Sequence, residues 1–179
     1  MRIIGGKLGG RLLKPNMKGW PTRPTTDISK EALFNILQNR IDFEGIRVLD
    51  LFGGAGNHSF EFLSRGCEHV TYVDLHPKCL EFVKKQSVEF GCEGRINVVR
   101  GDVRKFLKNC TLSFNYIFAG PPYPLIWLKE IPDIIGKRNL LNKGDFWVLE
   151  HNPTHDFSNH THFIEKRKYG QTIFSFFAP

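Results

Sequence analysis

Short runs of apolar residues recur along the chain, and each is separated from the next by a segment long enough to hold a helix. The runs are of strand length, are rich in β-branched and aromatic residues, and are bounded by glycine, proline or polar residues. We predict strands at 46–51, 69–74, 96–99, 114–119 and 146–151. We predict helices in the segments between them, at 58–64, from 76 onward, at 103–108 and at 125–136. This alternation predicts a doubly wound α/β fold. In the helix that starts at 76, the predicted apolar positions are Leu80, Phe82, Val83 and Val88.

The first forty residues follow a different pattern. Residues 2–4 and 11–13 are short apolar runs around a glycine-rich stretch, which predicts a small hairpin. A hairpin of this size is not stable alone, so it must dock on the main body. A loop rich in proline and glycine follows, and then an amphipathic pattern predicts a helix at 28–38, with N-cap candidates in 25–27.

The C-terminal part of the chain also departs from the alternating pattern. Residues 162–168 and 172–177 flank a short turn that contains Gly170, and this predicts an antiparallel hairpin. Such a hairpin added to parallel strands makes the sheet mixed. We see no linker that divides the chain, so we predict a single domain over 1–179. Within it, 1–24 form the N-terminal hairpin and loop, and 25–179 form the core.

Composition places the chain among ordinary globular domains. It has 179 residues, of which 41% are hydrophobic, and no apolar run approaches the ~20 residues that span a bilayer. The N-terminus lacks the apolar core of a signal peptide, so we expect a cytoplasmic protein that binds no membrane. The four cysteines form no C-x-x-C pair and the seven histidines have no metal-ligand spacing. We therefore predict reduced thiols and no metal site.

Charge distribution points to a polyanionic partner. The net charge is +7, and no acidic residue precedes Asp27. Such asymmetry is typical of phosphate contacts, although a solvated basic arm kept for solubility is the alternative. We assign nucleic-acid contacts to Arg2, Lys7, Arg11 and Arg23.

The strand at 46–51 leads directly into a glycine-rich turn and then a helix. A turn of this kind lets a ligand approach the backbone closely and offers it the N–H groups of a helix N-terminus. The third glycine of G-x-G-x-x-G is missing, and no Lys-Ser or Lys-Thr follows, so neither a dinucleotide nor a P-loop site is indicated. Asp50 before the turn suits a ligand with a cationic end, and Asp74 after the next strand suits ribose hydroxyls. A ligand with both groups and no phosphate is S-adenosylmethionine.

Several further residues are assigned to this cofactor site. Asp102 follows the third strand and suits an adenine amino group, although an N-cap for the helix at 103–108 is an equally good interpretation, and both roles can hold together. The alternative for the whole motif is a strand–turn–helix unit with two solvated acids. The predicted cofactor residues are Asp50, Phe52, Gly53, Gly54, Gly56, Asn57, Asp74, Leu75, Asp102 and Val103.

A second motif follows the strand at 114–119. We call Gly120-Pro121-Pro122-Tyr123 the Pro-Pro segment. Its prolines stiffen the backbone and its carbonyls can accept hydrogen bonds, while the tyrosine can stack on a base. Beside a cofactor crevice, this arrangement suits methyl transfer to the exocyclic amine of a nucleobase, and we assign catalytic roles to all four residues. The alternative is an ordinary proline-stiffened loop that covers the sheet edge.

These motifs together resemble a known family over nearly the whole chain. The opening 2–6 with Gly10-Arg11, the stretch 23–27 followed by 30–35, the glycine turn at 48–56, and Gly170-Gln171 are all similar to the RsmD-type methyltransferases. These enzymes modify a guanine N2 in bacterial small-subunit (16S) rRNA. The resemblance implies a Rossmann-like fold with a seven-stranded sheet, S-adenosylmethionine as cofactor, and small-subunit rRNA or a ribosomal particle as partner. We expect the protein to act as a monomer.

One position departs from the family pattern. The family has Asp or Asn before the two prolines, and this chain has Gly120. Either the substitution weakens catalysis while sparing the fold, or the backbone carbonyls suffice. Two alternative functions therefore stay open. One is DNA adenine-N6 methylation, and the other is a catalytically weakened RNA-binding or assembly protein.

Overall fold

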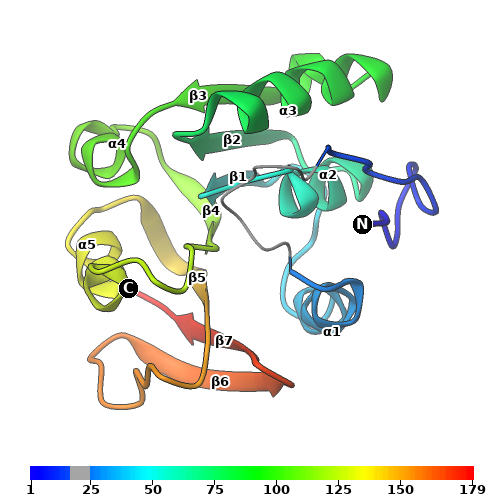
Figure 1. Ribbon diagram of the computed structural model, residues 1–179. Helices are drawn as coiled ribbons and strands as arrows, with labels where there is room; N and C mark the ends of the chain where they lie inside the picture. The colour runs from blue at the N-terminus through cyan, green and yellow to red at the C-terminus, as the bar shows by residue number, and fades with distance from the viewer. Residues whose placement is uncertain (17–24) are drawn as a thin grey trace.

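The protein is described by a computed structural model that covers residues 1–16 and 25–179 (Figure 1). Seven strands form one mixed sheet in the order β3-β2-β1-β4-β5-β7-β6. Arg23, which was predicted to contact nucleic acid, lies with most of the predicted loop around it in 17–24, outside the described residues. In chain order the strands are β1 (Arg47–Leu51), β2 (His69–Asp74), β3 (Ile96–Arg100), β4 (Phe114–Ala119), β5 (Leu141–His151), β6 (Phe163–Tyr169) and β7 (Thr172–Phe177).

The sheet is parallel from β3 to β5 and antiparallel at β7 and β6. The chain leaves β1 toward β2 on one side and later returns to place β4 on the other side of β1. The carboxyl ends of β1 and β4 therefore lie next to each other at a topological switch point, where ligands bind in open α/β sheets. The sequence prediction of a doubly wound, mixed sheet with a C-terminal hairpin is confirmed.

Helices cover both faces of the sheet, as Figure 1 shows. One core packs the first three helices and the N-terminal segment against one face, and a second core packs α4 and α5 against the other. Alternate residues of a strand enter the two cores, so Val48 lies in the first and Leu49 in the second. The helices are α1 (Asp27–Leu37), α2 (Asn57–Ser64), α3 (Pro77–Glu89), α4 (Val103–Asn109) and α5 (Ile131–Gly136), with short 3-10 turns at Glu93–Arg95 and Leu128–Glu130.

The N-terminal segment forms the expected hairpin. Arg2 and Leu12 make an antiparallel bridge, and the Ile3 amide donates to the Arg11 carbonyl at 2.9 Å. We call residues 1–14 the basic hairpin. It is fixed to α2 because Glu61 accepts hydrogen bonds from the amides of Ile4 and Gly5. A buried carboxylate therefore anchors the hairpin to the core.

Three expectations about elements were wrong in part. The helix predicted at 125–136 is a turn, a 3-10 turn and the short helix α5, since a Leu125 amide bond to Pro122 first closes a turn after the prolines. Strand β5 begins at Leu141, earlier than predicted, because Leu141 pairs with Phe114. The polar residues after Leu141 hide the apolar pattern that would have indicated a strand there. Val88 is 64% exposed, because the buried side of α3 carries Gln86 and Ser87 in its last turn.

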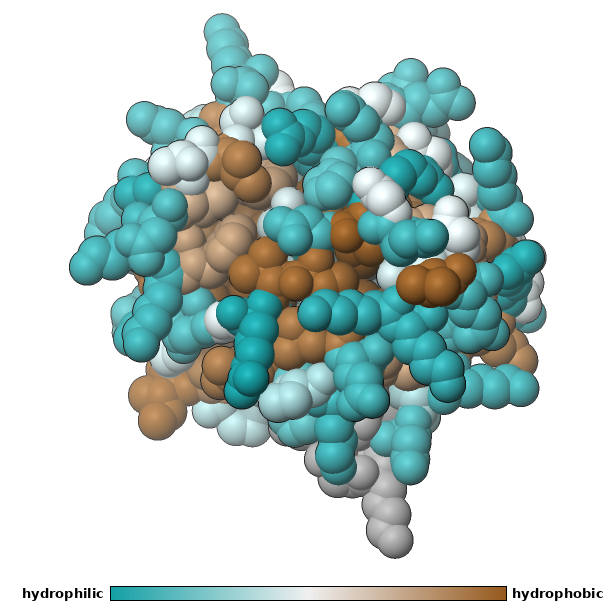
Figure 2. Space-filling model, turned by 90° about the horizontal axis from the view of Figure 1, so that it is seen from above, coloured by the Kyte–Doolittle hydropathy of each residue, from teal (hydrophilic) through white to brown (hydrophobic). Residues whose placement is uncertain are grey.

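Polar and charged side chains cover most of the face shown in Figure 2, with hydrophobic atoms gathered between them. Within residues 1–16 and 25–179, no helix is both long enough and apolar enough to cross a membrane.

Candidate active site

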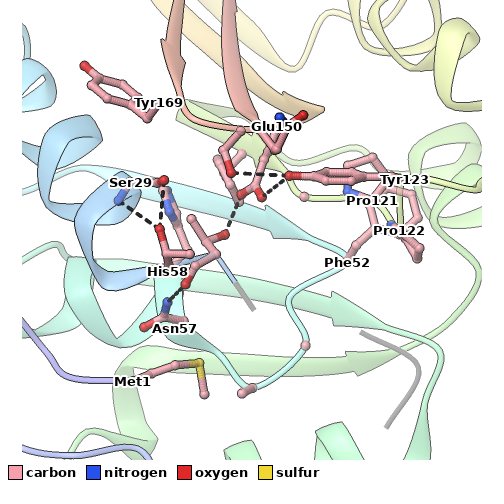
Figure 3. A pocket seen from close by; sticks show the side chains of 18 of the residues that line it. Met1, Ser29, Phe52, Asn57, His58, Pro121, Pro122, Tyr123, Glu150 and Tyr169 are labelled. Carbon is pink, nitrogen blue, oxygen red and sulfur yellow. Dashed lines mark hydrogen bonds between the residues drawn. The ribbon is translucent and has the colours of Figure 1, made fainter. Parts of the chain in front are cut away.

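A cavity of about 960 Å³ opens at the carboxyl ends of β1, β4 and β5 (Figure 3). Its walls come from the turn after β1, the Pro-Pro segment after β4, the start of α1 and the turn between β6 and β7. This volume is within the range of small-molecule sites. Of the predicted site residues, it is lined by Asp50, Phe52, Gly53, Gly54, Asn57, Gly120, Pro121, Pro122 and Tyr123.

The turn after β1, residues 52–56, bends sharply because its backbone enters the left-handed region three times. Gly54 and Gly56 have φ values of 54° and 72°, which glycine adopts without strain. Phe52 has a φ of 60° and is the one non-glycine residue with positive φ in the described chain. Such strain is concentrated at ligand sites, and here it brings the turn back over the end of β1.

Asp50 is almost completely buried at the end of β1, and it lines the cavity. Its carboxylate accepts hydrogen bonds from the Ser59 hydroxyl at 2.5 Å and from the Ser59 amide at 3.2 Å. Burial raises the pKa of Asp50 to about 7, and the bonds from Ser59 oppose that rise. A desolvated carboxylate of this kind gains from a cationic partner, so it suits the ammonium group of an amino acid.

Asn57 begins α2, and its side chain links that helix to α1. The Lys30 ammonium donates to Asn57 Oδ1 at 2.8 Å, and Asn57 Nδ2 reaches the Thr25 carbonyl at 3.5 Å. The residue lines the cavity, but these contacts show that its side chain also holds the first turn of α1 in place.

Gly53 is required by packing. A Cβ at this position would stand 2.2 Å from the Tyr72 ring, and the Tyr72 hydroxyl donates to the Gly54 carbonyl at 2.6 Å. The turn is thus held against β2 by a fully buried tyrosine.

Five predicted cofactor residues do not line this cavity. Asp74 accepts hydrogen bonds from the Gly54 and His76 amides, and Leu75 beside it is 61% exposed. Asp102 caps α4 by accepting from the Lys105 amide, so the N-cap interpretation is confirmed. The five residues lie in the turn after β1 or at the ends of β2 and β3, and are Gly56, Asp74, Leu75, Asp102 and Val103.

The Pro-Pro segment continues from β4 along the end of β1. The Gly120 amide donates to the Leu51 carbonyl at 3.1 Å, which keeps this residue in the sheet. The Tyr123 hydroxyl donates to Glu150 Oε1 at 3.1 Å, so its ring is held at the cavity wall (Figure 3). A fixed aromatic ring is a suitable surface for a base.

Glu150 lines the site but was not predicted from the sequence. It lies near the end of β5, is only 6% exposed and lines the cavity. Burial raises its pKa, while hydrogen bonds from Thr25 and Tyr123 oppose the rise. The signal was present, because an acidic residue near the carboxyl end of an apolar strand is what singled out Asp50 and Asp74.

His58 and Phe118 also line the cavity. Their rings stack with centroids 3.8 Å apart. Burial holds the pKa of His58 well below its usual value, so the imidazole is neutral. A Cβ at Gly120 would lie 3.0 Å from the Phe118 ring, so this ring crowds the position that lacks a side chain.

Comparison with known proteins places these features in a family. A family model described as "Conserved hypothetical protein 95" matches residues 1–178. The chain is 38% identical over 154 residues to the protein YlbH of Bacillus subtilis (strain 168), with 84% of this chain and 82% of YlbH covered. It is 31% identical over 153 residues to a Haemophilus influenzae protein named Ribosomal RNA small subunit methyltransferase D, with 84% and 78% covered.

The chain belongs to the RsmD-type methyltransferase family. A solved structure of the Escherichia coli protein yhhF agrees with this, with a TM-score of 0.83 at 25% identity and with 99% of this chain and 96% of that chain covered. The resemblance seen in the sequence and the Rossmann-like fold that it implied are confirmed. The protein is an enzyme of the methyltransferase class.

In this RsmD-type chain the basic hairpin lies beside the cavity. Met1 lines the cavity, while Arg2, Lys7 and Arg11 are exposed. Three of the four predicted nucleic-acid contacts therefore point to solvent from an element next to the site. This placement is compatible with their predicted role, which remains a prediction.

Proposed function

We propose that this protein transfers a methyl group from S-adenosylmethionine to the exocyclic N2 amine of a guanine in small-subunit rRNA. The observation that carries the proposal is the shared cavity, because it joins the Asp50 carboxylate and the glycine turn to the rigid Pro-Pro segment. The name of the Haemophilus influenzae relative supports the substrate class.

The residues at the first strand fit this cofactor. Asp50 offers a buried carboxylate for the amino-acid end, and the glycine turn exposes backbone close to the cavity. Asp74 and Asp102 stand at the next two strand ends, where ribose and adenine groups would find acceptors. The cofactor supplies an electrophilic methyl group when it is bound.

The Pro-Pro segment would present the target base. Its prolines restrict the backbone, and Tyr123 offers a ring whose orientation is fixed by its hydroxyl bond to Glu150. Positioning an amine and a methyl donor in one enclosed site can account for a large part of the rate enhancement.

The cavity mouth offers further contacts to RNA. Ile28 lines the cavity and is 79% exposed, and Ile126, close to the Pro-Pro segment, is 99% exposed. Exposed apolar side chains next to a basic hairpin suit unstacked bases flanked by phosphates, the form in which RNA is usually recognised. We therefore expect a single-stranded or locally opened target.

A methyl-transfer assay tests this function. Labelled S-adenosylmethionine would be offered with small-subunit particles that lack the modification, with naked small-subunit rRNA, and with duplex DNA. We expect label in the particle or the rRNA, recovered as N2-methylguanosine after digestion to nucleosides. Label in DNA as N6-methyladenine would favour the DNA enzyme, and cofactor binding without transfer to any substrate would favour the assembly protein.

A further inference from the structure

The position before the two prolines lacks a side-chain acceptor. Gly120 carries no side chain, yet an exocyclic amine needs a group that takes a hydrogen bond from its N–H and aligns its lone pair. When the nitrogen attacks, the N–CH3 bond forms and the S–CH3 bond breaks. The sulfonium becomes a neutral thioether, and the nitrogen must release a proton.

Glu150 stands on the strand next to this position. In the parallel pairing of β4 and β5, Ala119 is opposite Leu149, so the next residues along the two strands are Gly120 and Glu150. Neighbouring strands are about 4.8 Å apart. Because side chains alternate along a strand, Glu150 points to the same face as Val148 and Phe118, which is the face that holds the cavity.

The carboxylate is held ready to accept. The Tyr123 hydroxyl donates to Glu150 Oε1 (Figure 3). The Thr25 hydroxyl donates to Oε2, so both carboxylate oxygens are held. A carboxylate has about four acceptor sites, so these two bonds leave room for an amine N–H. Its burial weakens solvation of the charge and makes it a better proton acceptor than an exposed glutamate.

We propose that Glu150 is a catalytic residue that accepts a hydrogen bond, and then the proton, from the target amine in place of a side chain at position 120. This inference rests on the proposed function. The carboxylate becomes a carboxylic acid as the N–CH3 bond forms, and it returns the proton to water after the product leaves. The bonds from Thr25 and Tyr123 keep it directed at the cavity throughout.

The test compares the unsubstituted protein with Glu150→Gln in single-turnover methyl transfer at saturating S-adenosylmethionine and RNA. We expect the rate to fall by roughly 10²–10³-fold, the usual effect of losing one positioned polar group at a reacting centre. Calorimetry with S-adenosylhomocysteine and filter binding with RNA should give unchanged dissociation constants. Glu165→Gln, on β6 and outside the cavity lining, is the matched control and should keep the full rate.

A rescue separates catalysis from structural support. Gly120→Asp places a carboxylate back at the family position, and Phe118→Leu removes the ring that a Cβ there would crowd. The triple variant Gly120→Asp, Phe118→Leu, Glu150→Gln should be much faster than the double variant Phe118→Leu, Glu150→Gln. If Glu150→Gln is slow and these substitutions do not restore its rate, the loss of rate comes from displacement of Thr25 and Tyr123. That result would overturn the catalytic role.

The remaining outcomes are also decisive. If the unsubstituted protein transfers methyl groups and Glu150→Gln is equally fast, this inference is overturned and the proposed function stands. No transfer by the unsubstituted protein overturns both. If Glu150→Gln does not fold, Glu150→Asp takes its place, because it keeps the charge and withdraws it by one methylene. A slower rate then supports the role and an unchanged rate overturns it.

Discussion

At the scale of the residue, the site depends on carboxylates that the fold has removed from water. Asp50 and Glu150 both line the cavity, and burial raises the pKa of each. Charged groups are costly in such a place unless a partner compensates them. Their position therefore indicates ligands with a cationic group and an N–H donor, which the proposed cofactor and substrate supply.

Asp50 should make cofactor binding depend on pH. Its pKa is about 7 in the unliganded protein, and only the ionised form attracts an ammonium group. Between pH 6 and 8 the affinity for S-adenosylmethionine should rise by about tenfold, and it should level off above pH 8. Asp50→Asn should bind more weakly and lose this dependence, as titration calorimetry at several pH values would show. A wild-type affinity that is flat across this range would contradict the assignment.

The same substitution should affect stability in the opposite direction. The folded pKa lies above the unfolded value of ~3.9, so the folded state binds more protons between these values and stability falls as pH rises from 4 to 7. At pH 8 the free energy of unfolding of Asp50→Asn should exceed that of the wild type by about 2–4 kcal/mol without ligand. At pH 4 urea unfolding should show little difference. A destabilised variant at pH 8 would show that the Ser59 bonds outweigh desolvation.

At the scale of the element, a buried ion cluster joins three segments. Lys30 Nζ contacts the Arg2 carbonyl at 2.6 Å, Asn57 at 2.8 Å and Glu61 at 3.2 Å, and Glu61 also pairs with Arg65. Glu61 is fully buried and accepts the amides of the basic hairpin. Through this cluster, α1 and α2 fix the hairpin beside the cavity.

Lys30→Met should loosen this junction. Among the described residues it leaves Arg65 as the one ion-pair partner of Glu61, and loss of one partner from a buried pair costs about 3 kcal/mol. Urea unfolding should show that loss, and hydrogen exchange should accelerate first at the Ile4 and Gly5 amides. Lys166→Met, which breaks the exposed pair with Asp156, is the control and should cost less than about 1 kcal/mol. Equal effects of the two substitutions would contradict a structural role for the buried cluster.

The sequence predicted β1 to β4 well because each of them is a short, largely apolar run with clear boundaries. It predicted the placement of Asp50 and the Pro-Pro segment for the same reason, since Asp50 lies at the end of one such run and the Pro-Pro segment directly follows another. It could not reveal that Gly53 is needed for Tyr72, because that contact joins the turn after β1 to β2. The Thr25 and Tyr123 bonds to Glu150 were hidden in the same way, since they join residues far apart in the sequence. The helix expected at 125–136 was shortened by turn bonds that follow the prolines.

At the scale of the whole molecule, charge and cavity lie on connected elements. The basic hairpin carries Arg2, Lys7 and Arg11 on its surface and reaches the cavity through Met1. A polyanion held by this hairpin would pass the cavity mouth. This arrangement underlies our proposal that the hairpin contributes affinity for RNA and that the cavity receives one of its bases.

Neutralising Arg2, Lys7 and Arg11 together with glutamine should weaken rRNA binding and flatten its salt dependence. Each phosphate contact contributes about 0.7–0.9 to the slope of log K against log salt, so the slope should fall by about two. Filter binding over a range of salt concentrations measures it. The control makes the same change at three exposed lysines on the opposite face of the sheet. They are Lys105 and Lys108 on α4, and Lys137 after α5. A slope that falls equally in both variants would show that the hairpin has no special role.

The most direct measurement is a crystal structure of the protein with S-adenosylhomocysteine bound. The amino group of that product should lie against Asp50, its ribose against Asp74, and its sulfur should face the Pro-Pro segment with Glu150 beyond it. A product molecule held away from the tip of β1, or with its sulfur turned from Tyr123, would contradict the assignment of this cavity as the place of methyl transfer.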